Sequence, residues 1–459
     1  MARYDSMAVN ILPFMLVFIL LAIFSFDKLI YLIVIFSPLS IELSYFRPGL
    51  GINMFLPTEP LLFGVLILFL LKVISEQKFE RRILLHPVSI AIYLNLFWIF
   101  ITTLTSSMPV VSLKFFLARI WFLAAFYFLM SKIFLDRKNF EKYVWLYLSG
   151  LLIVVVYTII RHTGYGLLNK HAAHFVATPF YNDHTSYGAA LAMLLPFPAW
   201  FALSRVYTVR VRFFSSIIFM ILFIAFILSY SRAAWLSMMV AVAVLIIMKL
   251  RIRFRTIVIT AIVALGIIFS FQHEIVNYLE KNSGESSSNL TEHFTSMGNI
   301  SSDDSNLERL NRWRSAILMF QERPVFGYGP GTYIFQYGKY QLKKDRTIIS
   351  TNAGDAGNAH SEYLGPLSES GIGGLLTFLL IIVTVLYTGI RTWGRLKNYR
   401  FKGIVLVSVL GLITYYIHGF LNNFLDTDKL SAPFWGFTAI IVVIDIISQD
   451  EQLDTDRKE

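Results

Sequence analysis

The chain has 459 residues, of which 56% are hydrophobic, 16% are aromatic and 15% are charged, and its formal net charge is +11. Soluble domains carry about 25% charged and about 45–50% apolar residues. With a mean hydropathy of +0.62, the composition therefore excludes an ordinary soluble enzyme, a disordered chain and a collagen-like fibre. The sequence contains no cysteine, which excludes a disulfide framework, a thiolate metal site and a cysteine nucleophile.

Apolar stretches recur along almost the whole chain. A bilayer core about 30 Å thick requires roughly 20 mostly apolar residues per helix. Stretches that approach this length lie at residues 8–25, 29–45, 57–75, 88–106, 114–135, 140–160, 186–204, 213–230, 232–248, 254–271, 371–392, 403–422 and 433–448. They do not alternate in polarity as β-barrel strands do. The sequence thus predicts an all-α polytopic membrane protein with about 12–13 transmembrane helices.

Basic residues cluster in every second connection between these stretches. The clusters contain Lys78, Arg81 and Arg82; Lys132, Arg137, Lys138 and Lys142; Arg205, Arg210 and Arg212; Lys249, Arg251, Arg253 and Arg255; and Arg391, Arg395, Lys397, Arg400 and Lys402. Cytoplasmic connections are enriched in lysine and arginine, so we expect these connections on the cytoplasmic side and residues 161–185 and 272–370 outside. The positive charge then reports membrane topology, and no nucleic-acid partner is expected.

One long polar segment divides the chain. Residues 1–271 form the predicted N-terminal transmembrane part, 272–370 a large extracytoplasmic loop, 371–448 the C-terminal transmembrane part and 449–459 an acidic cytoplasmic tail. Within the loop, Ser305 and Glu308 form a predicted capping box, and the helix that follows should end before Pro324. Arg309 and Arg312 would lie one turn apart on this helix.

His360 is the candidate proton acceptor. We expect a short helix capped by Asn358, with His360 in its first turn. There the helix dipole disfavours the imidazolium, and a neutral imidazole can act as a general base. The alternative is that His360 only hydrogen-bonds the loop.

Arg232 is the candidate cation near the membrane, because it interrupts the apolar segment LSYSRAAWL. An arginine close to hydrocarbon marks a functional site by default, although snorkelling to the interface explains it as well. For Arg119 and Arg161, interfacial anchoring is the favoured interpretation. Asp183 and His184, which follow Asn182, are placed to position a hydroxyl or to cap the next helix.

The candidate residues together suit a phosphate ligand. Arginine binds phosphate oxygens through two parallel hydrogen bonds. We find no dense carboxylate cluster, which argues against a divalent metal site, although Glu362 and Glu369 leave open a pair of glycosidase carboxylates. The pattern favours a lipid-phosphate or lipid-diphosphate substrate.

Four segments resemble the O-antigen ligase and Wzy-polymerase family. HSEYLGPLSESG, from His360 to Gly371, is similar to the histidine motif of the family, and RLNRWRSAILMFQERPVFGYGPGTY (309–333) is similar to the arginine and glycine stretch that precedes it. YSRAAWL and YNDHTSYGAALAMLLP resemble two further family segments. The segments occur in the family's order over about 180–450, and the long loop stands where the family has it.

This resemblance implies a metal-independent glycosyltransferase of the GT-C type, without a cofactor, in the bacterial inner membrane. It would move a glycan from undecaprenyl diphosphate to an acceptor hydroxyl on the periplasmic face. By the resemblance, Arg232 and Arg309 would bind the donor diphosphate, Arg312 could exchange roles with Arg309, and His360 would act on the acceptor. Further positioning candidates are Asn182, Asp183, His184 and Glu362.

The resemblance leaves the acceptor open. Ligases of the family use lipid A-core, polymerases use another lipid-linked repeat unit, and some members glycosylate proteins; we favour a ligase. Outside this class, a solute transporter is the alternative. It would be favoured by paired broken helices in two halves of the chain, and the sequence shows no such pair.

Overall fold

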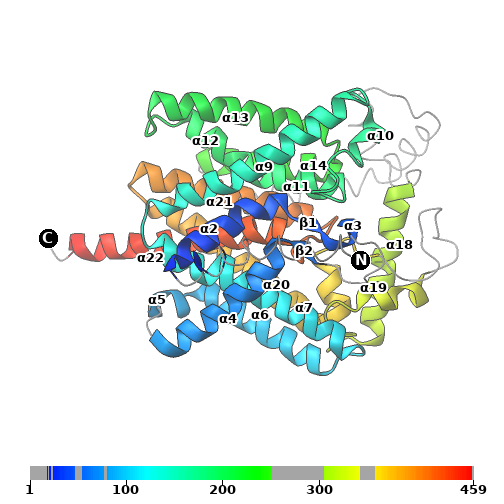
Figure 1. The fold of residues 1–459 in the computed structure, drawn as a ribbon. Helices are drawn as coiled ribbons and strands as arrows, with labels where there is room; N and C mark the ends of the chain where they lie inside the picture. The colour runs from blue at the N-terminus through cyan, green and yellow to red at the C-terminus, as the bar shows by residue number, and fades with distance from the viewer. Residues whose placement is uncertain are drawn as a thin grey trace, which may run out of the picture.

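The computed structural model describes residues 18, 20, 21, 24–46, 54–76, 80–250, 304–341 and 357–456. The predicted span at 254–271 and almost all of that at 8–25 lie outside these residues, as do parts of the predicted loop at 272–370. Figure 1 shows a bundle of helices with roughly aligned axes and a few short elements at one end.

Nine helices in the described ranges are long and apolar enough to cross a membrane. With the segments that continue them, they are α6 (Pro87–Leu104), α7 (Pro109–Phe122) with the π-helical η2 (Leu123–Leu129) and α8 (Met130–Phe134), α9 (Asn139–Thr163), α11 (His184–Leu194) with α12 (Pro196–Leu203), α13 (Val209–Leu228), α14 (Arg232–Leu250), α20 (Leu364–Arg395), α21 (Tyr399–His418) and α22 (Asp428–Asp456). Each coincides with a predicted stretch, and α4 (Thr58–Glu76) coincides with another. The predicted class, an all-α polytopic membrane protein, is confirmed.

The prediction of a span at 29–45 is wrong. The helix there, α2 (Phe26–Phe36), has 11 residues, fewer than the roughly 20 that a bilayer requires. A 3₁₀ turn at Ser37–Leu39 follows, because Pro38 cannot continue the helical hydrogen bonds. The chain then forms β1 (Ile41–Glu42), which pairs antiparallel with β2 (Phe55–Leu56), and α3 (Leu43–Phe46).

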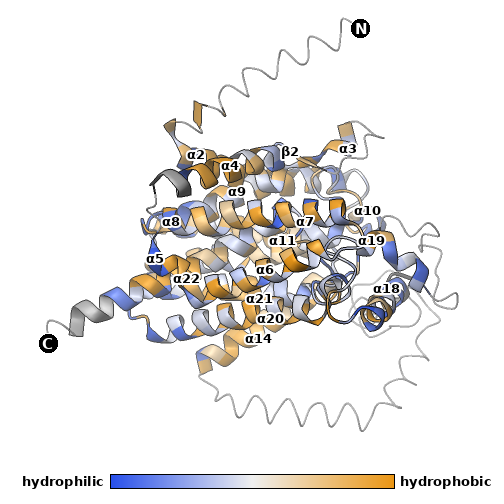
Figure 2. Ribbon diagram, turned by 90° about the horizontal axis from the view of Figure 1, so that it is seen from below, coloured by the Kyte–Doolittle hydropathy of each residue, from blue (hydrophilic) through white to orange (hydrophobic). Residues whose placement is uncertain are grey.

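The centre of the bundle is α22, whose membrane-length window is fully buried. Neighbouring helices approach it closely at small residues, as is usual in membrane bundles. A Cβ atom at Gly436 would lie 2.2 Å from Oη of Tyr143, and this hydroxyl donates to the carbonyl oxygen of Ala432 at 2.6 Å. By contrast, α13 exposes Phe213 and Phe214, which suits a surface in contact with lipid. Figure 2 shows hydrophobic residues along α4, α6 and α14 and mainly hydrophilic ones on α18 (Asp304–Glu322).

The bundle has two chemically different ends (Figure 1). One, here called the loop end, holds β1, β2, α10 (Lys170–Ala173), α18 and α19 (Tyr333–Gln336). The other, here called the basic end, holds α5 (Arg81–Leu84) and the C-terminus. The described parts of the connections at 161–185 and 272–370 therefore share one end, as the alternation of basic clusters predicts.

Candidate functional site

A kink in α20 anchors the glycine-rich loop that follows α18. At Gly371 the backbone has φ 65° and ψ −165°, a conformation that favours glycine. The kink interrupts the helical ladder, and backbone groups of the loop occupy the freed positions. The amide of Gly329 donates to the carbonyl of Glu369 at 2.7 Å, and the amide of Ile372 donates to the carbonyl of Pro324 at 2.9 Å. As predicted, α18 ends before Pro324, at Glu322. The loop thus fixes α18 on a membrane helix.

α18 in turn holds the segment that carries His360. Arg312 donates from Nη1 to the carbonyl of Asn358 at 3.2 Å, and Trp313 donates from Nε1 to the carbonyl of His360 at 3.3 Å. Nε of Arg312 also donates to Oε1 of Glu308 at 2.7 Å. Glu308, predicted as part of a capping box, therefore serves to orient Arg312; the side chain of Ser305 lies outside the described residues.

The prediction that His360 lies in a first helical turn is wrong. α20 begins only at Leu364, and His360 has φ 46°, which a helix does not admit. Oδ1 of Asn358 accepts from the amide of His360 at 3.1 Å. Oγ of Ser361 accepts from the amides of Tyr363 and Leu364 at 3.2 and 3.3 Å, so the side chain that bonds the first amide of α20 is Ser361 and not Asn358.

His360 is nevertheless neutral, for a different reason from the one predicted. Burial, followed by the nearby charges of Arg312 and Arg309, lowers the pKa of His360 to about 4. Asp183 and Glu308 oppose this shift more weakly. The imidazole is therefore unprotonated near pH 7 because of burial and two guanidinium groups, not because of a helix dipole.

A second histidine cluster stands at the start of α11. Oδ1 of Asp183 accepts from the amide of Thr185 at 3.0 Å, so Asp183 caps the helix, which was one of its two predicted roles. The same oxygen lies 3.0 Å from Nδ1 of His184. The ring of His174 lies 4.1 Å from that of His184, centroid to centroid. Partial burial, and then His184, lower the pKa of His174 to about 4.

Two further predicted residues have partners that fix the scaffold. Nδ2 of Asn182 donates to Oε2 of Glu42 at 2.8 Å and so links α11 to β1. Oε1 of Glu362 accepts from Oη of Tyr415 at 2.6 Å and from the amides of Phe424 and Leu425 at 2.8 and 2.9 Å. The buried Glu362 carboxylate therefore holds the turn between α21 and α22.

Arg232 is the first residue of α14. Ser231 packs against α11, because a Cβ atom at Gly188 would lie 2.7 Å from Cβ of Ser231. Tyr230, with φ 49°, and His360 are the non-glycine residues with positive φ in the described part of the chain. Residues with a strained backbone conformation of this kind are concentrated at functional sites. The convergence of the Arg232 and Arg309 guanidiniums stays a prediction.

His418, at the end of α21, is a residue that the sequence analysis missed. It is fully buried, and its Nε2 lies 3.1 Å from Nδ2 of Asn422. The charges of Asp183, Arg309 and His184 act on it. Arg309 and Asp183 also act on His360. His360 and His418 are therefore both under the influence of Arg309 on α18 and of Asp183 at the start of α11, although no local pattern links residues so far apart in sequence.

The site places the neutral imidazole of His360 under the influence of the guanidinium groups of Arg309 and Arg312. In the described ranges no group of three or more histidine, aspartate or glutamate side chains is arranged to hold a metal ion. Guanidinium groups bind phosphate oxygens, and an unprotonated imidazole accepts a proton. The arrangement is thus suited to an anionic ligand beside a reacting hydroxyl.

Fold and site together define a polytopic α-helical membrane protein with a cationic site at the loop end. Within it, residues 217–379 match the O-antigen ligase family model, which confirms the predicted resemblance to this family. The matched segment contains Arg232, Arg309, Arg312 and His360. The chain is also 23% identical over 233 residues to an uncharacterized protein of Haemophilus influenzae (strain ATCC 51907 / DSM 11121 / KW20 / Rd). The match covers 47% of this chain and 52% of that protein, so the chain spans about half the length of the relative.

Proposed function

We propose that the protein transfers a glycan from undecaprenyl diphosphate to an acceptor hydroxyl at the loop end, on the periplasmic face of the bacterial inner membrane. We further propose lipid A-core as the acceptor, which makes the protein an O-antigen ligase. The match to the O-antigen ligase family model supports the reaction class. The observation that carries the proposal is the neutral His360, on which Arg309 and Arg312 act.

In this proposal the arginines bind the donor diphosphate. Arg309, Arg312 and Arg232 supply the charge, and Arg312 is oriented in advance by its hydrogen bond to Glu308 and by the ring of Tyr337, 5.5 Å from its guanidinium carbon. Side chains held in place before the ligand arrives lose less entropy on binding. Positive charge at this position also stabilises the negative charge that develops on the leaving diphosphate.

The transfer step forms one bond and breaks another. The oxygen of the acceptor hydroxyl bonds to the anomeric carbon of the donor sugar, while the bond from that carbon to the diphosphate oxygen breaks. The hydroxyl proton goes to the imidazole of His360, and undecaprenyl diphosphate leaves with the bonding electron pair. Asp183 and His184, which lie within electrostatic range of the same site, are placed to position the acceptor.

Donor binding strengthens the base. With a pKa of about 4, His360 is neutral but weakly basic, and the best general bases have a pKa near the working pH. A diphosphate beside Arg309 and Arg312 offsets the charges that lower this pKa. The imidazole therefore becomes a better proton acceptor when the donor is in place, which couples proton transfer to donor binding.

A transfer assay tests the proposal. Purified wild-type protein in detergent is given a lipid-linked glycan donor and lipid A-core, and product is quantified. His360→Ala should abolish transfer while donor binding and thermal stability persist. The matched control is His171→Ala, which removes an exposed histidine at the same end. Normal transfer by a well-folded His360→Ala protein would remove the histidine from the mechanism.

The acceptor is tested by deleting the gene and examining the surface glycan on a gel. Loss of all attached long chains supports the ligase. Chains shortened to a single repeat would contradict the ligase and favour a polymerase. An unchanged pattern would contradict both and favour the transporter.

A further inference from the structure

A separate cavity lies at the basic end, between α5, α6, α20 and α22. Its volume is about 440 Å³, and Arg81, Arg82 and Arg391 line it together with Asp445. None of these residues belongs to the loop-end site, and the segment that matches the O-antigen ligase family model ends before Arg391. The cavity therefore requires an explanation of its own.

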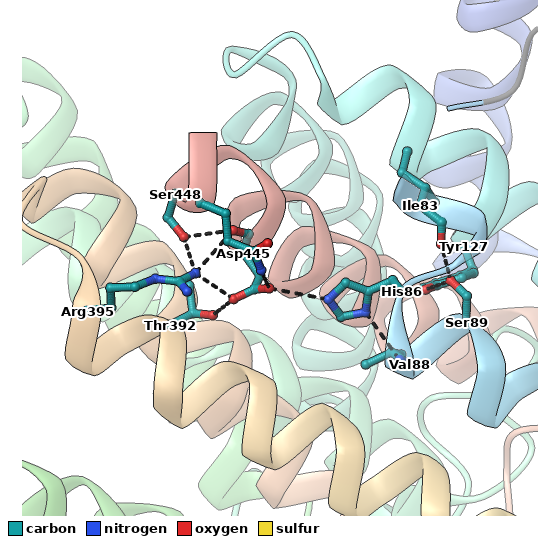
Figure 3. Close-up of polar contacts among 10 residues, drawn as sticks. Ile83, His86, Val88, Ser89, Tyr127, Thr392, Arg395, Asp445 and Ser448 are labelled. Atoms are coloured by element: carbon teal, nitrogen blue, oxygen red, sulfur yellow. Dashed lines mark hydrogen bonds and ion pairs between the residues drawn. The ribbon is translucent and has the colours of Figure 1, made fainter. Parts of the chain in front are cut away.

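His86 and Asp445, which line the cavity, belong to a polar network that Figure 3 shows. The Asp445 carboxylate on α22 accepts from Oγ1 of Thr392 at 2.5 Å and from Nη2 of Arg395 at 2.8 Å. Nε2 of His86 faces it at 3.4 Å, and Nδ1 of His86 accepts from the amide of Val88 at 3.2 Å. Because Arg395 compensates Asp445, this carboxylate contributes little net negative charge to the cavity.

The mouth of the cavity, in contrast, carries excess positive charge. Arg82 is compensated by Glu80, at 3.0 Å, and by Asp450. In the described part of the chain, neither Arg81 nor Arg391 makes a side-chain hydrogen bond or an ion pair. Both are exposed. Two guanidinium groups, one from α5 and one from α20, thus line one cavity with no ion-pair partner among the residues that the structure describes.

Apolar side chains lie beside these arginines. Leu85 and Tyr387 line the same cavity, and they are 57% and 64% exposed. A free phosphate ion gains nothing from such a surface, whereas a lipid presents a phosphate next to acyl chains. Basic pockets between membrane helices are known to accept anionic lipid headgroups.

We propose that this cavity binds the phosphate headgroup of an anionic membrane lipid. Arg81 and Arg391 bind the phosphate oxygens, and Leu85 and Tyr387 contact the start of the acyl chains. The Asp445 network holds α20 and α22 at the spacing that keeps the two arginines on one cavity. The inference is independent of the glycan-transfer site.

Lipid binding to the full-length purified protein tests the proposal. Phosphatidylglycerol and phosphatidylcholine are titrated into the detergent-solubilised protein, and bound lipid is counted by native mass spectrometry. The test variant is Arg81→Gln/Arg391→Gln. The matched control, Arg205→Gln/Arg210→Gln, removes two exposed arginines from another basic connection. Each arginine near an anionic lipid contributes about a fivefold gain in affinity, so the test variant should lose about 25-fold for phosphatidylglycerol.

The outcomes separate a lipid from a soluble phosphate. The proposal requires that phosphatidylglycerol binds more tightly than phosphatidylcholine, that the test variant loses this preference, and that the control keeps it. Millimolar inorganic phosphate should not displace the lipid. Equal loss in both variants, or no preference in the wild-type protein, would overturn the site. Displacement by inorganic phosphate would overturn the lipid as its ligand. Because the removed side chains are exposed and make no ion pair within the described ranges, thermal stability should not change.

Discussion

At the basic end, His86 and Arg395 both face one carboxylate, that of Asp445. At the loop end, His360 experiences the charges of Arg312 and Arg309 more strongly than those of Asp183 and Glu308. The histidines at the two ends thus have different charged neighbours: His86 faces a carboxylate that is shared with an arginine, whereas His360 is influenced mainly by two arginines. A compensated buried cluster holds helices together, and removing one partner is strongly destabilising. A histidine on which two arginines act most strongly suits a site for an anion that arrives from outside.

The largest expected effect separates the two ends directly. His360→Ala should lower the transfer rate by about 10²–10⁴-fold, the usual loss when a general base is removed, with little change in melting temperature. Asp445→Asn should do the reverse, because it weakens charged hydrogen bonds; we expect a drop in Tm of about 3–8 °C and nearly normal transfer by the folded protein. Transfer rates and thermal unfolding of both purified variants check this. A stable but inactive Asp445→Asn protein would show that Asp445 serves transfer and not stability.

The next largest effect should come from replacing a donor-binding arginine by lysine. Arg309→Lys keeps the charge but loses the two parallel hydrogen bonds to phosphate. We expect kcat/KM to fall about 10–100-fold, which corresponds to the loss of about one hydrogen bond to a charged group. Donor binding should also be weaker. The same change at Arg232 should act alike if both bind the diphosphate. Steady-state kinetics over a range of donor concentrations measure the effect; Arg314→Lys on the same helix is the control. Unchanged donor affinity in both variants would exclude them from diphosphate binding.

The pH dependence of the reaction should reveal the coupling between donor binding and the basicity of His360. His360 must be unprotonated to accept a proton, so activity falls as the pH drops through its pKa. In kcat/KM, which reports the free enzyme, the fall should lie near pH 4. In kcat, which reports the donor complex, it should lie at higher pH, because the diphosphate offsets the arginine charges. If kcat and kcat/KM fall at the same pH, and both falls persist in His360→Ala, then the titrating group is a residue other than His360.

The smallest effect should come from the support of the histidine segment. Trp313→Phe removes the hydrogen bond from Nε1 to the carbonyl of His360, which is 3.3 Å long, but keeps an aromatic ring. A hydrogen bond of this kind contributes about 1 kcal/mol, so we expect kcat to fall about fivefold with KM unchanged. A rise in KM alone would place Trp313 in substrate binding.

Much of the fold could be predicted from local patterns. Apolar length predicted α6 at 88–106 and α14 at 232–248, where the structure has Pro87–Leu104 and Arg232–Leu250. Pro324 correctly predicted the end of α18. The failure at 29–45 has a local cause that hydropathy does not register, since Pro38 ends the helix inside an apolar run.

The site was less accessible to such reasoning. His360 was expected in a helix because Asn358 resembles a cap, but the positive φ of His360 depends on contacts from α18. Its neutrality was predicted from a helix dipole and arises from burial and two arginines. His418 and the Asp445 network join residues far apart in sequence, and no spacing rule in a single sequence indicates such pairs.

We expect an anion to complete the loop-end site and thereby to make His360 an effective base. The direct measurement is an NMR titration of imidazole resonances in the histidine-labelled protein, with His360 assigned from its loss in His360→Ala. Without ligand, its pKa should lie near 4. With undecaprenyl diphosphate bound, it should rise towards the ordinary value of about 6.5, and the rise should be smaller in Arg309→Gln. A pKa that stays the same or falls on binding would show that the anion does not make His360 a stronger base.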